Sequence, residues 1–239
     1  MSDPVAYWNL DEASGTRDDA VGANNLTDNN TVTQAVGKVS NAAQFTRANN
    51  EWLEGADSAD LSYSGNFSFS CWAYLDSEPA GGILGIAGKG NAGATQREWY
   101  LAYRQSTDRF EFYVFHALGG TAVGIEATTF GAVTTGTWYF ICCRWTESSG
   151  TVEIGVNGGT FDSAADAGID PQNGTSAFTL GRRFADETGN NFDGRIDEAD
   201  LTKAVLTADE VTTRYNGGSG NTYPFPTYKH GQFFHVMPF

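Results

Sequence analysis

Residues 66–75 read NFSFSCWAYL, and their side chains alternate between two kinds. The odd-numbered positions from Phe67 to Ala73 are apolar, whereas the even-numbered positions carry two serines, then Trp72 and Tyr74. Successive side chains of an extended strand point to opposite faces, so this period of two predicts a β-strand with a wholly apolar core face. A helix would need a period of 3.6, which the stretch does not show.

The segments around this strand repeat the pattern. Residues 98–104 (EWYLAYR) and 109–116 (RFEFYVFH) predict an antiparallel pair joined by a QSTD turn. Residues 137–146 (TWYFICCRWT) are apolar on both faces and predict a central strand that is covered on both sides. Residues 151–159 (TVEIGVNGG) end in an Asn-Gly turn, which favours a hairpin because both residues tolerate positive φ.

A helix is predicted once, at 206–218 (LTADEVTTRYNGG). Thr207 is placed as the N-cap with Glu210 three residues later, which is a capping box, and Gly217 is a plausible stop. By contrast, residues 11–41 are rich in Asp, Asn, Gly and Thr and predict loops. Many short strands with one terminal helix predict an all-β, antiparallel two-sheet sandwich or jelly roll.

Composition excludes several classes of protein. The 239 residues carry a net charge of −15 without any cluster of Lys and Arg, so a nucleic-acid partner is excluded. No apolar stretch approaches the roughly 18 residues of a membrane span. The start, MSDPVAYWNLDE, lacks the basic and apolar regions of a signal peptide and predicts a product made in a cytoplasm; the alternative is a trimmed piece of an exported protein. Three cysteines at irregular spacing predict buried thiols rather than disulfides or a zinc site.

Several motifs, taken in order, resemble those of a known family. They are AYWNLDEASGT at 6–16, GKVSNAAQFTRANNEWLE at 37–54, FSFSCWAYL, TWYFICCRW, VEIGVNGG, LGRR, FDGRIDEADL at 192–201 and LTADEVTTRY at 206–215. Together they resemble a laminin-G-like jelly-roll domain of the concanavalin A-like lectin/glucanase superfamily, over roughly residues 5–216. The resemblance implies one domain at 1–216, and a linker with an apolar tail remains at 217–239.

The residue pattern predicts a protein without enzymatic activity. Glycoside hydrolysis needs two carboxyl groups on either side of the scissile bond. The glucanases of the superfamily carry theirs on one strand as Glu-x-Asp-x-x-Glu, and this array is absent from the sequence. Glu111 has no second acidic residue two or four positions further on, and the three histidines have no Ser or Cys partner in a recognisable motif.

The resemblance also implies one structural calcium ion. In similar glucanases an aspartate of the last strand binds calcium together with backbone carbonyls from two other segments. By this resemblance the calcium-binding aspartate is Asp197. An EF-hand is a separate possibility, and its pattern is absent from 192–201. The carbonyl donors would come from the vicinity of Pro4, Val5, Arg47 and Asn49. The alternative is that Asp197 caps backbone N–H groups without a metal.

Sugar binding would need exposed aromatic rings. Four residues are predicted to share one sheet face, opposite the face of Phe69, Leu101 and Val114, and to form a glycan-binding platform: Trp72, Tyr74, Tyr100 and Tyr113. The alternative is that the other sheet or a loop covers this face.

The tail is too apolar to remain in water. After a GGSGN linker at 217–221, its apolar residues are Phe225, Phe233, Phe234, Val236, Met237 and Phe239. The prolines at 224, 226 and 238 disfavour helix, so we expect an extended strap that binds a partner subunit. The alternative is a tail that folds back on its own sandwich.

Two functional hypotheses follow, and the sequence favours the first. The first is a non-enzymatic virion surface component, such as a phage capsid decoration or fibre protein, that attaches to other subunits through its tail. The second is a glycan-binding module of an exported bacterial protein, which would act outside the cell. The first is motivated by the signal-free start and the tail, and the second by the family and the aromatic residues.

Overall fold

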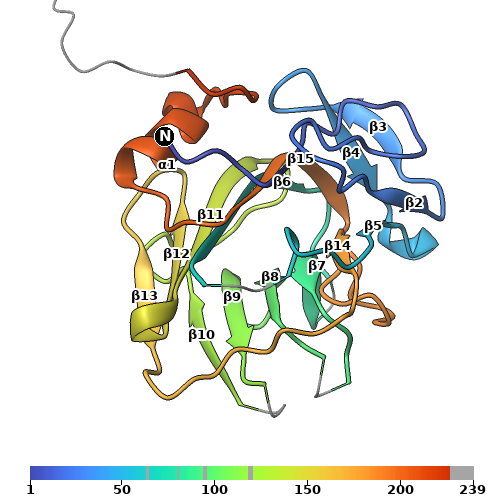
Figure 1. The fold of residues 1–239 in the computed structure, drawn as a ribbon. Helices are drawn as coiled ribbons and strands as arrows, with labels where there is room; N and C mark the ends of the chain where they lie inside the picture. Colours follow the sequence, from blue (N-terminus) through green and yellow to red (C-terminus); the bar gives the residue numbers. More distant parts are fainter. Residues whose placement is uncertain (63–64, 80, 94–95, 118–120, 227–239) are drawn as a thin grey trace, which may run out of the picture.

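The computed structural model describes residues 1–62, 65–79, 81–93, 96–117 and 121–226. Within these ranges the chain forms two antiparallel sheets that pack face to face, with a helix outside the sandwich (Figure 1). The all-β jelly-roll prediction is therefore confirmed.

The first sheet has eight strands in the order β13-β12-β11-β6-β15-β4-β3, and β1 pairs with β15 as well. Its strands are β1 (Ala6–Trp8), β3 (Thr33–Val36), β4 (Asn41–Phe45), β6 (Phe67–Leu75), β11 (Trp138–Thr146), β12 (Thr151–Val156), β13 (Asp162–Ala165) and β15 (Gly194–Thr202).

The second sheet has seven strands in the order β10-β9-β8-β7-β14-β5-β2. Its strands are β2 (Thr27–Asn29), β5 (Trp52–Gly55), β7 (Ile83–Lys89), β8 (Trp99–Arg104), β9 (Arg109–Phe115), β10 (Ala122–Glu126) and β14 (Phe178–Leu180). Three short 3₁₀ helices lie at Arg47–Asn49, Glu147–Ser149 and Asn216–Gly218.

The core lies between the two sheets, as the alternation predicts. The odd-numbered residues of β6 from Phe67 to Ala73 belong to it, together with Leu101 and Val114 of the second sheet. Aromatic rings cross the interface, and Trp8 stacks on Phe178 with ring centroids 5.0 Å apart. Burial of these side chains supplies the main favourable term in folding.

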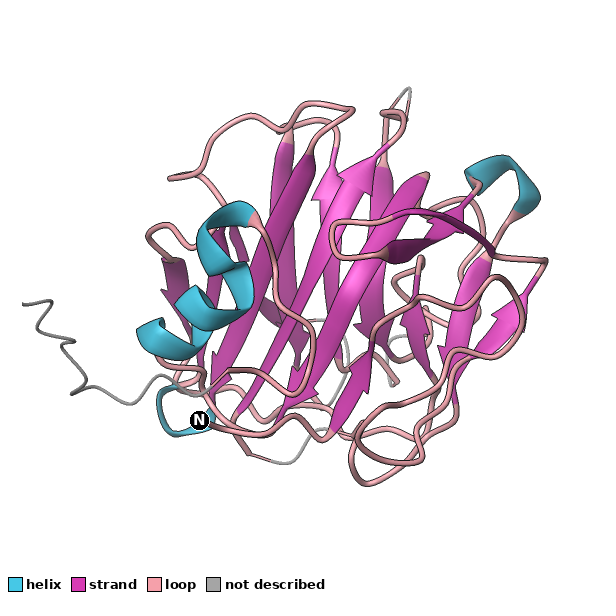
Figure 2. Ribbon diagram, turned by 90° about the horizontal axis from the view of Figure 1, so that it is seen from above, coloured by secondary structure: helices cyan, strands magenta, loops and turns pink. Residues whose placement is uncertain are grey.

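The helix α1 (Ala208–Tyr215) covers part of the outer face of the first sheet (Figure 2). Its capping box forms as predicted: the Thr207 hydroxyl accepts from the Glu210 N–H, and the Glu210 carboxylate accepts from the Thr207 N–H. Tyr215 stacks on Trp72, and β11 is buried on both faces as expected. Asn216, in a left-handed conformation, ends the helix one residue before the predicted stop.

The uneven apolar pattern of β15 has a structural cause. Its pairing with β6 shifts register between Asp197 and Asp200, and Glu198 adopts a φ of 49° at this bulge. Ile196 and Leu201 consequently both reach the core although they are five residues apart.

The segment 217–226 is packed against the sandwich, so the prediction of a free linker at 217–221 is wrong. Asn221 donates to the Thr213 carbonyl, and Gly220 lies so close to Trp72 and Val39 that a Cβ would stand 2.7 Å from the valine.

The beginning of the tail folds back as well, as the alternative proposed. Phe225 is buried against Tyr7 and the Arg214 guanidinium, which lies 4.3 Å from its ring centroid. The other predicted tail contacts lie outside the described residues: Phe233, Phe234, Val236, Met237 and Phe239.

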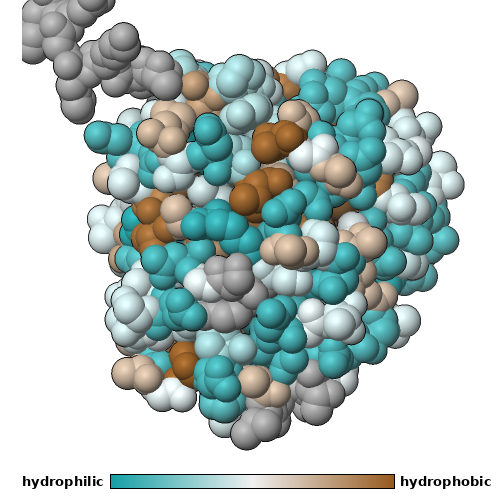
Figure 3. Space-filling view, in the orientation of Figure 1, coloured by the Kyte–Doolittle hydropathy of each residue, from teal (hydrophilic) through white to brown (hydrophobic). Residues whose placement is uncertain are grey.

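The face shown in Figure 3 is mostly hydrophilic, with scattered apolar side chains. Cys71, Cys142 and Cys143 are buried and free, as predicted. Of the helices described, none has the length and apolarity to cross a membrane.

Candidate functional site

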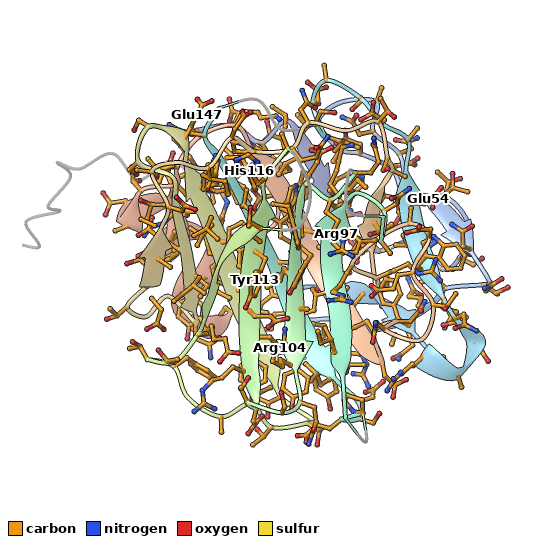
Figure 4. The ribbon with its side chains drawn as sticks, turned by 90° about the horizontal axis from the view of Figure 1, so that it is seen from below. Glu54, Arg97, Arg104, Tyr113, His116 and Glu147 are labelled. Carbon is orange, nitrogen blue, oxygen red and sulfur yellow. The ribbon has the colours of Figure 1, made fainter. Side chains whose placement is uncertain are left out.

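A pocket of about 410 Å³ opens on the outer face of the second sheet, over β8 and β9. Figure 4 looks onto this face, where Arg104 and Tyr113 are labelled on β8 and β9 and Arg97 is labelled near them. Aromatic rings and three arginines make up most of the pocket lining. The lining residues are Ala92, Arg97, Tyr100, Arg104, Tyr113, Phe115, Ala122, Arg183, Phe184 and Glu187.

Two tyrosines from neighbouring strands form the floor. Tyr100 and Tyr113 are directly opposite in the β8–β9 register, and their rings stack with centroids 5.2 Å apart. Tyr100 is buried, whereas Tyr113 is half-buried. Gly124 faces Tyr113 across the next strand pair, and a Cβ there would stand 2.2 Å from the tyrosine ring. Glycine at this position therefore lets the ring lie flat across β10.

The loop between β14 and β15 forms one wall. It lies directly on β7 because Gly85 and Gly88 have no side chains: a Cβ at Gly88 would stand 2.0 Å from the Arg183 carbonyl oxygen. This contact brings Arg183 and Phe184 beside the tyrosines, with the Arg183 guanidinium 5.0 Å from the Tyr100 ring centroid. Glu187 holds Arg183 through a two-point ion pair.

A buried carboxylate lies under the floor. Glu111 is fully buried, accepts from Arg104 through both oxygens and accepts from the Tyr100 hydroxyl at 3.1 Å. Burial raises the pKa of Glu111, and Arg104 opposes this shift. Burial also raises the pKa of Tyr100, with Glu111 as the second cause, so the tyrosine stays a neutral hydrogen-bond donor.

Arg97 forms the opposite rim. Its Nε and Nη2 both donate to the Ala92 carbonyl, Nε at 3.0 Å. Its guanidinium lies 5.6 Å from the Phe115 ring centroid and 5.7 Å from that of Phe184.

The structure divides the predicted platform between two sheets. Tyr100 and Tyr113 belong to the second sheet and line the pocket, but Trp72 and Tyr74 lie on β6 of the first sheet. Trp72 is 2% exposed beneath α1, as the covering alternative proposed, and Tyr74 packs against Trp138. The prediction of one four-residue platform is therefore wrong.

The predicted calcium ligands do not converge. Asp197 Oδ2 accepts from the N–H groups of Lys38 and Val39, at 2.7 and 2.9 Å, which is the capping alternative. The Arg47 N–H instead donates to Asp193, and the Val5 N–H donates to the Leu201 carbonyl.

Asp193 comes just before β15 and Leu201 lies beyond its bulge, each four residues from Asp197 along the chain. Carbonyls near Pro4, Val5, Arg47 and Asn49 are thus not placed around Asp197. Across the described ranges no group of three His, Cys, Asp or Glu side chains could hold a metal. The predicted carbonyl donors are not gathered around Asp197, and calcium binding there remains a prediction.

One carboxylate near the pocket escaped the sequence analysis. Glu126 of β10 is directly opposite Glu111, and both approach Arg104, Glu126 at 3.7 Å from Nε. Glu111 cannot touch a substrate because its side chain is fully buried and both its oxygens are paired. Glu111 and Glu126 are brought together by the register between β9 and β10. The spacing of acidic residues along one strand could not have predicted this pair.

Comparison with family models gives one match. The model Laminin_G_3, described as the Concanavalin A-like lectin/glucanases superfamily, matches residues 40–212. A comparison with curated proteins finds no significant match.

Several solved structures share the fold. The binding domain of Paraclostridial Mosquitocidal Protein 1 has a TM-score of 0.72 at 15% identity, with 90% of this chain and 52% of that chain covered. The botulinum neurotoxin serotype D ligand-binding domain, solved with N-acetylneuraminic acid, has a TM-score of 0.67 at 12% identity. The match covers 90% of this chain and 50% of that chain. This chain thus spans about half the length of these toxin domains.

A single-domain structure matches over its full length. Domain 4 of AbnA, an extracellular arabinanase from Geobacillus stearothermophilus solved with arabinotriose, has a TM-score of 0.63 at 19% identity, with 92% of this chain and 99% of that chain covered. At these identities the structural matches show the fold alone.

Proposed function

This chain belongs to the Concanavalin A-like lectin/glucanases superfamily, and we propose that it is a carbohydrate-binding module without catalytic activity. The observation that carries the proposal is the pocket over Tyr100 and Tyr113. It combines a stacked aromatic floor with arginine side chains at its edges.

The pocket has the properties that sugar binding needs. Its volume of about 410 Å³ lies within the range of roughly 300–1,000 Å³ that is usual for small-molecule sites. The half-buried Tyr113 offers an apolar ring face to the C–H groups of a pyranose, and the arginines donate hydrogen bonds to hydroxyl oxygens. Because Tyr100 and Tyr113 are on strands rather than loops, the tyrosine floor is held in place before a ligand arrives.

The comparisons support this reading over the virion hypothesis. The arabinanase domain and the neurotoxin domain named above were both solved with saccharides, and none of the three reported matches is a virion component. A glycan-binding module would act where glycans are exposed, which favours an extracellular place. Attachment to other subunits through the tail remains a hypothesis on residues outside those described.

The absence of catalysis is part of the same proposal. A glycosidase needs two carboxyl groups that reach the substrate, with one of them able to donate a proton. Of the Glu111–Glu126 pair, only Glu126 is solvent-accessible, and Arg104 lines the pocket whereas neither carboxylate does.

A titration with a panel of oligosaccharides tests the proposal. We expect calorimetry to detect binding of at least one saccharide, and Tyr113→Ala to weaken it roughly tenfold, which corresponds to about 1.4 kcal/mol. Tyr74→Ala is the matched control, because Tyr74 is also half-buried on an outer sheet face but belongs to the other sheet. Absence of binding across the panel, or equal weakening by both substitutions, would contradict the proposal.

A further inference from the structure

The three pocket arginines are not equivalent. Arg104 is paired with Glu111 and approaches Glu126, and Arg183 is paired with Glu187. Arg97 has no carboxylate within ion-pair distance among the residues that the structure describes. Its positive charge is therefore the one charge of this trio that the surrounding protein does not neutralise.

Part of the Arg97 guanidinium is not used by the protein itself. The Ala92 carbonyl takes two of the five N–H donors of Arg97, through Nε and Nη2. Nη1 makes no hydrogen bond to the described residues, so donors of the guanidinium remain available to a ligand.

The Arg97 guanidinium is also held in a defined place. It lies over the Phe115 and Phe184 rings, and the Tyr100 ring lies 5.8 Å from both of these rings. The arginine and the tyrosine floor thus share one pair of phenylalanines and bound the same pocket. Apolar rings beside a cation reduce its access to water, which strengthens its interaction with an anion.

We infer that the pocket selects acidic saccharides, with the sugar carboxylate paired to the Arg97 guanidinium while a sugar ring lies on Tyr113. The inference rests on the proposed function and adds the charge of the ligand to it. The planar guanidinium fits a planar carboxylate through two parallel hydrogen bonds, a geometry that the ammonium group of lysine cannot offer. Arg104 and Arg183 add hydrogen-bond donors to the site while their own charges are already paired.

The test compares ligands that differ only in charge. Galacturonic acid oligomers are titrated beside their methyl esters, and sialyllactose beside lactose. Sulfated galactose oligomers form a further arm. The buffer contains 0.15 M salt, where the Debye length is about 8 Å, so that repulsion from the net charge of −15 is screened.

Two substitutions isolate the arginine. We expect Arg97→Gln to reduce the affinity for the carboxylated ligand roughly ten- to a hundredfold and to leave the affinity for its neutral counterpart unchanged. The affinity of Arg97→Lys for the carboxylated ligand should lie between those of the wild type and of Arg97→Gln. Arg47→Gln is the matched control, since Arg47 also donates Nε and Nη2 to one backbone carbonyl, that of Gly189, but does not line the pocket. Thermal melting of each variant confirms that it is folded.

Each outcome is decisive. Preference for at least one carboxylated ligand over its neutral counterpart, lost in Arg97→Gln and kept in Arg47→Gln, supports the inference. Equal binding of acidic and neutral sugars overturns the inference but not the proposed function. A preference for the acidic sugar that survives Arg97→Gln has the same consequence. Stronger binding of sulfated than of carboxylated sugars overturns the commitment to a carboxylate. Absence of binding by every saccharide overturns the proposed function together with the inference.

Discussion

The buried carboxyl group of Asp197 makes stability depend on pH. Burial raises its pKa to about 7, against 3.8 in a model compound, and the N–H groups of Val39 and Lys38 oppose this shift only in part. The folded state therefore holds a proton between pH 4 and 7 that the unfolded state has released. This contribution to stability is fully present below about pH 4 and is lost as the pH rises through 7.

The expected magnitude follows from the shift. Between pH 5.5 and 8.5 an unfolded Asp197 is ionised throughout, whereas the folded carboxyl changes from protonated to ionised. The pKa of about 7 lies 1.5 units above the lower pH, and each unit corresponds to about 1.4 kcal/mol, so roughly 2 kcal/mol is lost over this interval. For a chain of this size the melting temperature falls by about 4–8 °C.

Urea unfolding of the wild type and of Asp197→Asn at both pH values measures this loss. Asparagine stays neutral, so the stability difference between the two proteins should change by about 2 kcal/mol between pH 5.5 and 8.5. The neighbouring Glu198, whose pKa burial raises to about 8, is present in both proteins, and its own titration cancels in the difference. Identical pH dependence of the two proteins would refute the reasoning.

The same samples test the calcium hypothesis. Calcium needs an ionised carboxylate, so a bound ion would remove the proton and stabilise the protein at pH 8.5. Because two N–H groups already donate to Asp197 Oδ2, we expect EDTA to leave the melting temperature of the wild type unchanged. A fall with EDTA that is absent in Asp197→Asn would restore the ligand role.

Three further predictions concern the pocket, the C-terminal segment and catalysis. Gly124→Ala should displace the Tyr113 ring and weaken saccharide binding roughly tenfold in calorimetry, whereas Gly168→Ala, whose Cβ would meet only a side-chain oxygen at 3.4 Å, should not. Phe225→Ala should lower the free energy of unfolding in urea by about 2–3 kcal/mol, because the ring is 8% exposed; an unchanged value would show that the segment contributes nothing. No sugar should be released from a β-glucan panel, and release that Glu126→Gln abolishes would disprove the absence of catalysis.

Sequence patterns predicted the strands well because alternation is a local property. Side chains of β6 and of β8 each face the side that their period of two indicates. Alternation does not say which sheet a strand joins, because that depends on contacts between residues far apart in the chain. Trp72 and Tyr100 were therefore placed on one face although they lie on the outer faces of different sheets.

The loop region at 11–41 shows the limit of composition. Its Asn and Asp content predicts turns, yet β2 and β3 form there as strands of three and four residues at the ends of the two sheets. These short edge strands are stabilised by pairing with β5 and β4, and not by the strand propensity of their own residues. A signal for the pocket was present in the spacing of Gly85 and Gly88, since glycine within a strand indicates close approach of another backbone.

The position of the pocket follows from how differently the two outer faces are covered. On the first sheet, α1 places Tyr215 and Val211 directly over Trp72, so this part of the face becomes a second apolar core. On the second sheet, the loop that carries Arg183 is seated on β7, at one side of the tyrosines, and β10 offers a glycine rather than a side chain at the other. The half-buried Tyr113 ring thus remains accessible between two arginine-bearing segments, beside the buried Tyr100 ring. Under the proposed function, the same sandwich buries one outer face for stability and leaves the other to a ligand, because loops and glycines, and not the core, decide which face a ligand can reach.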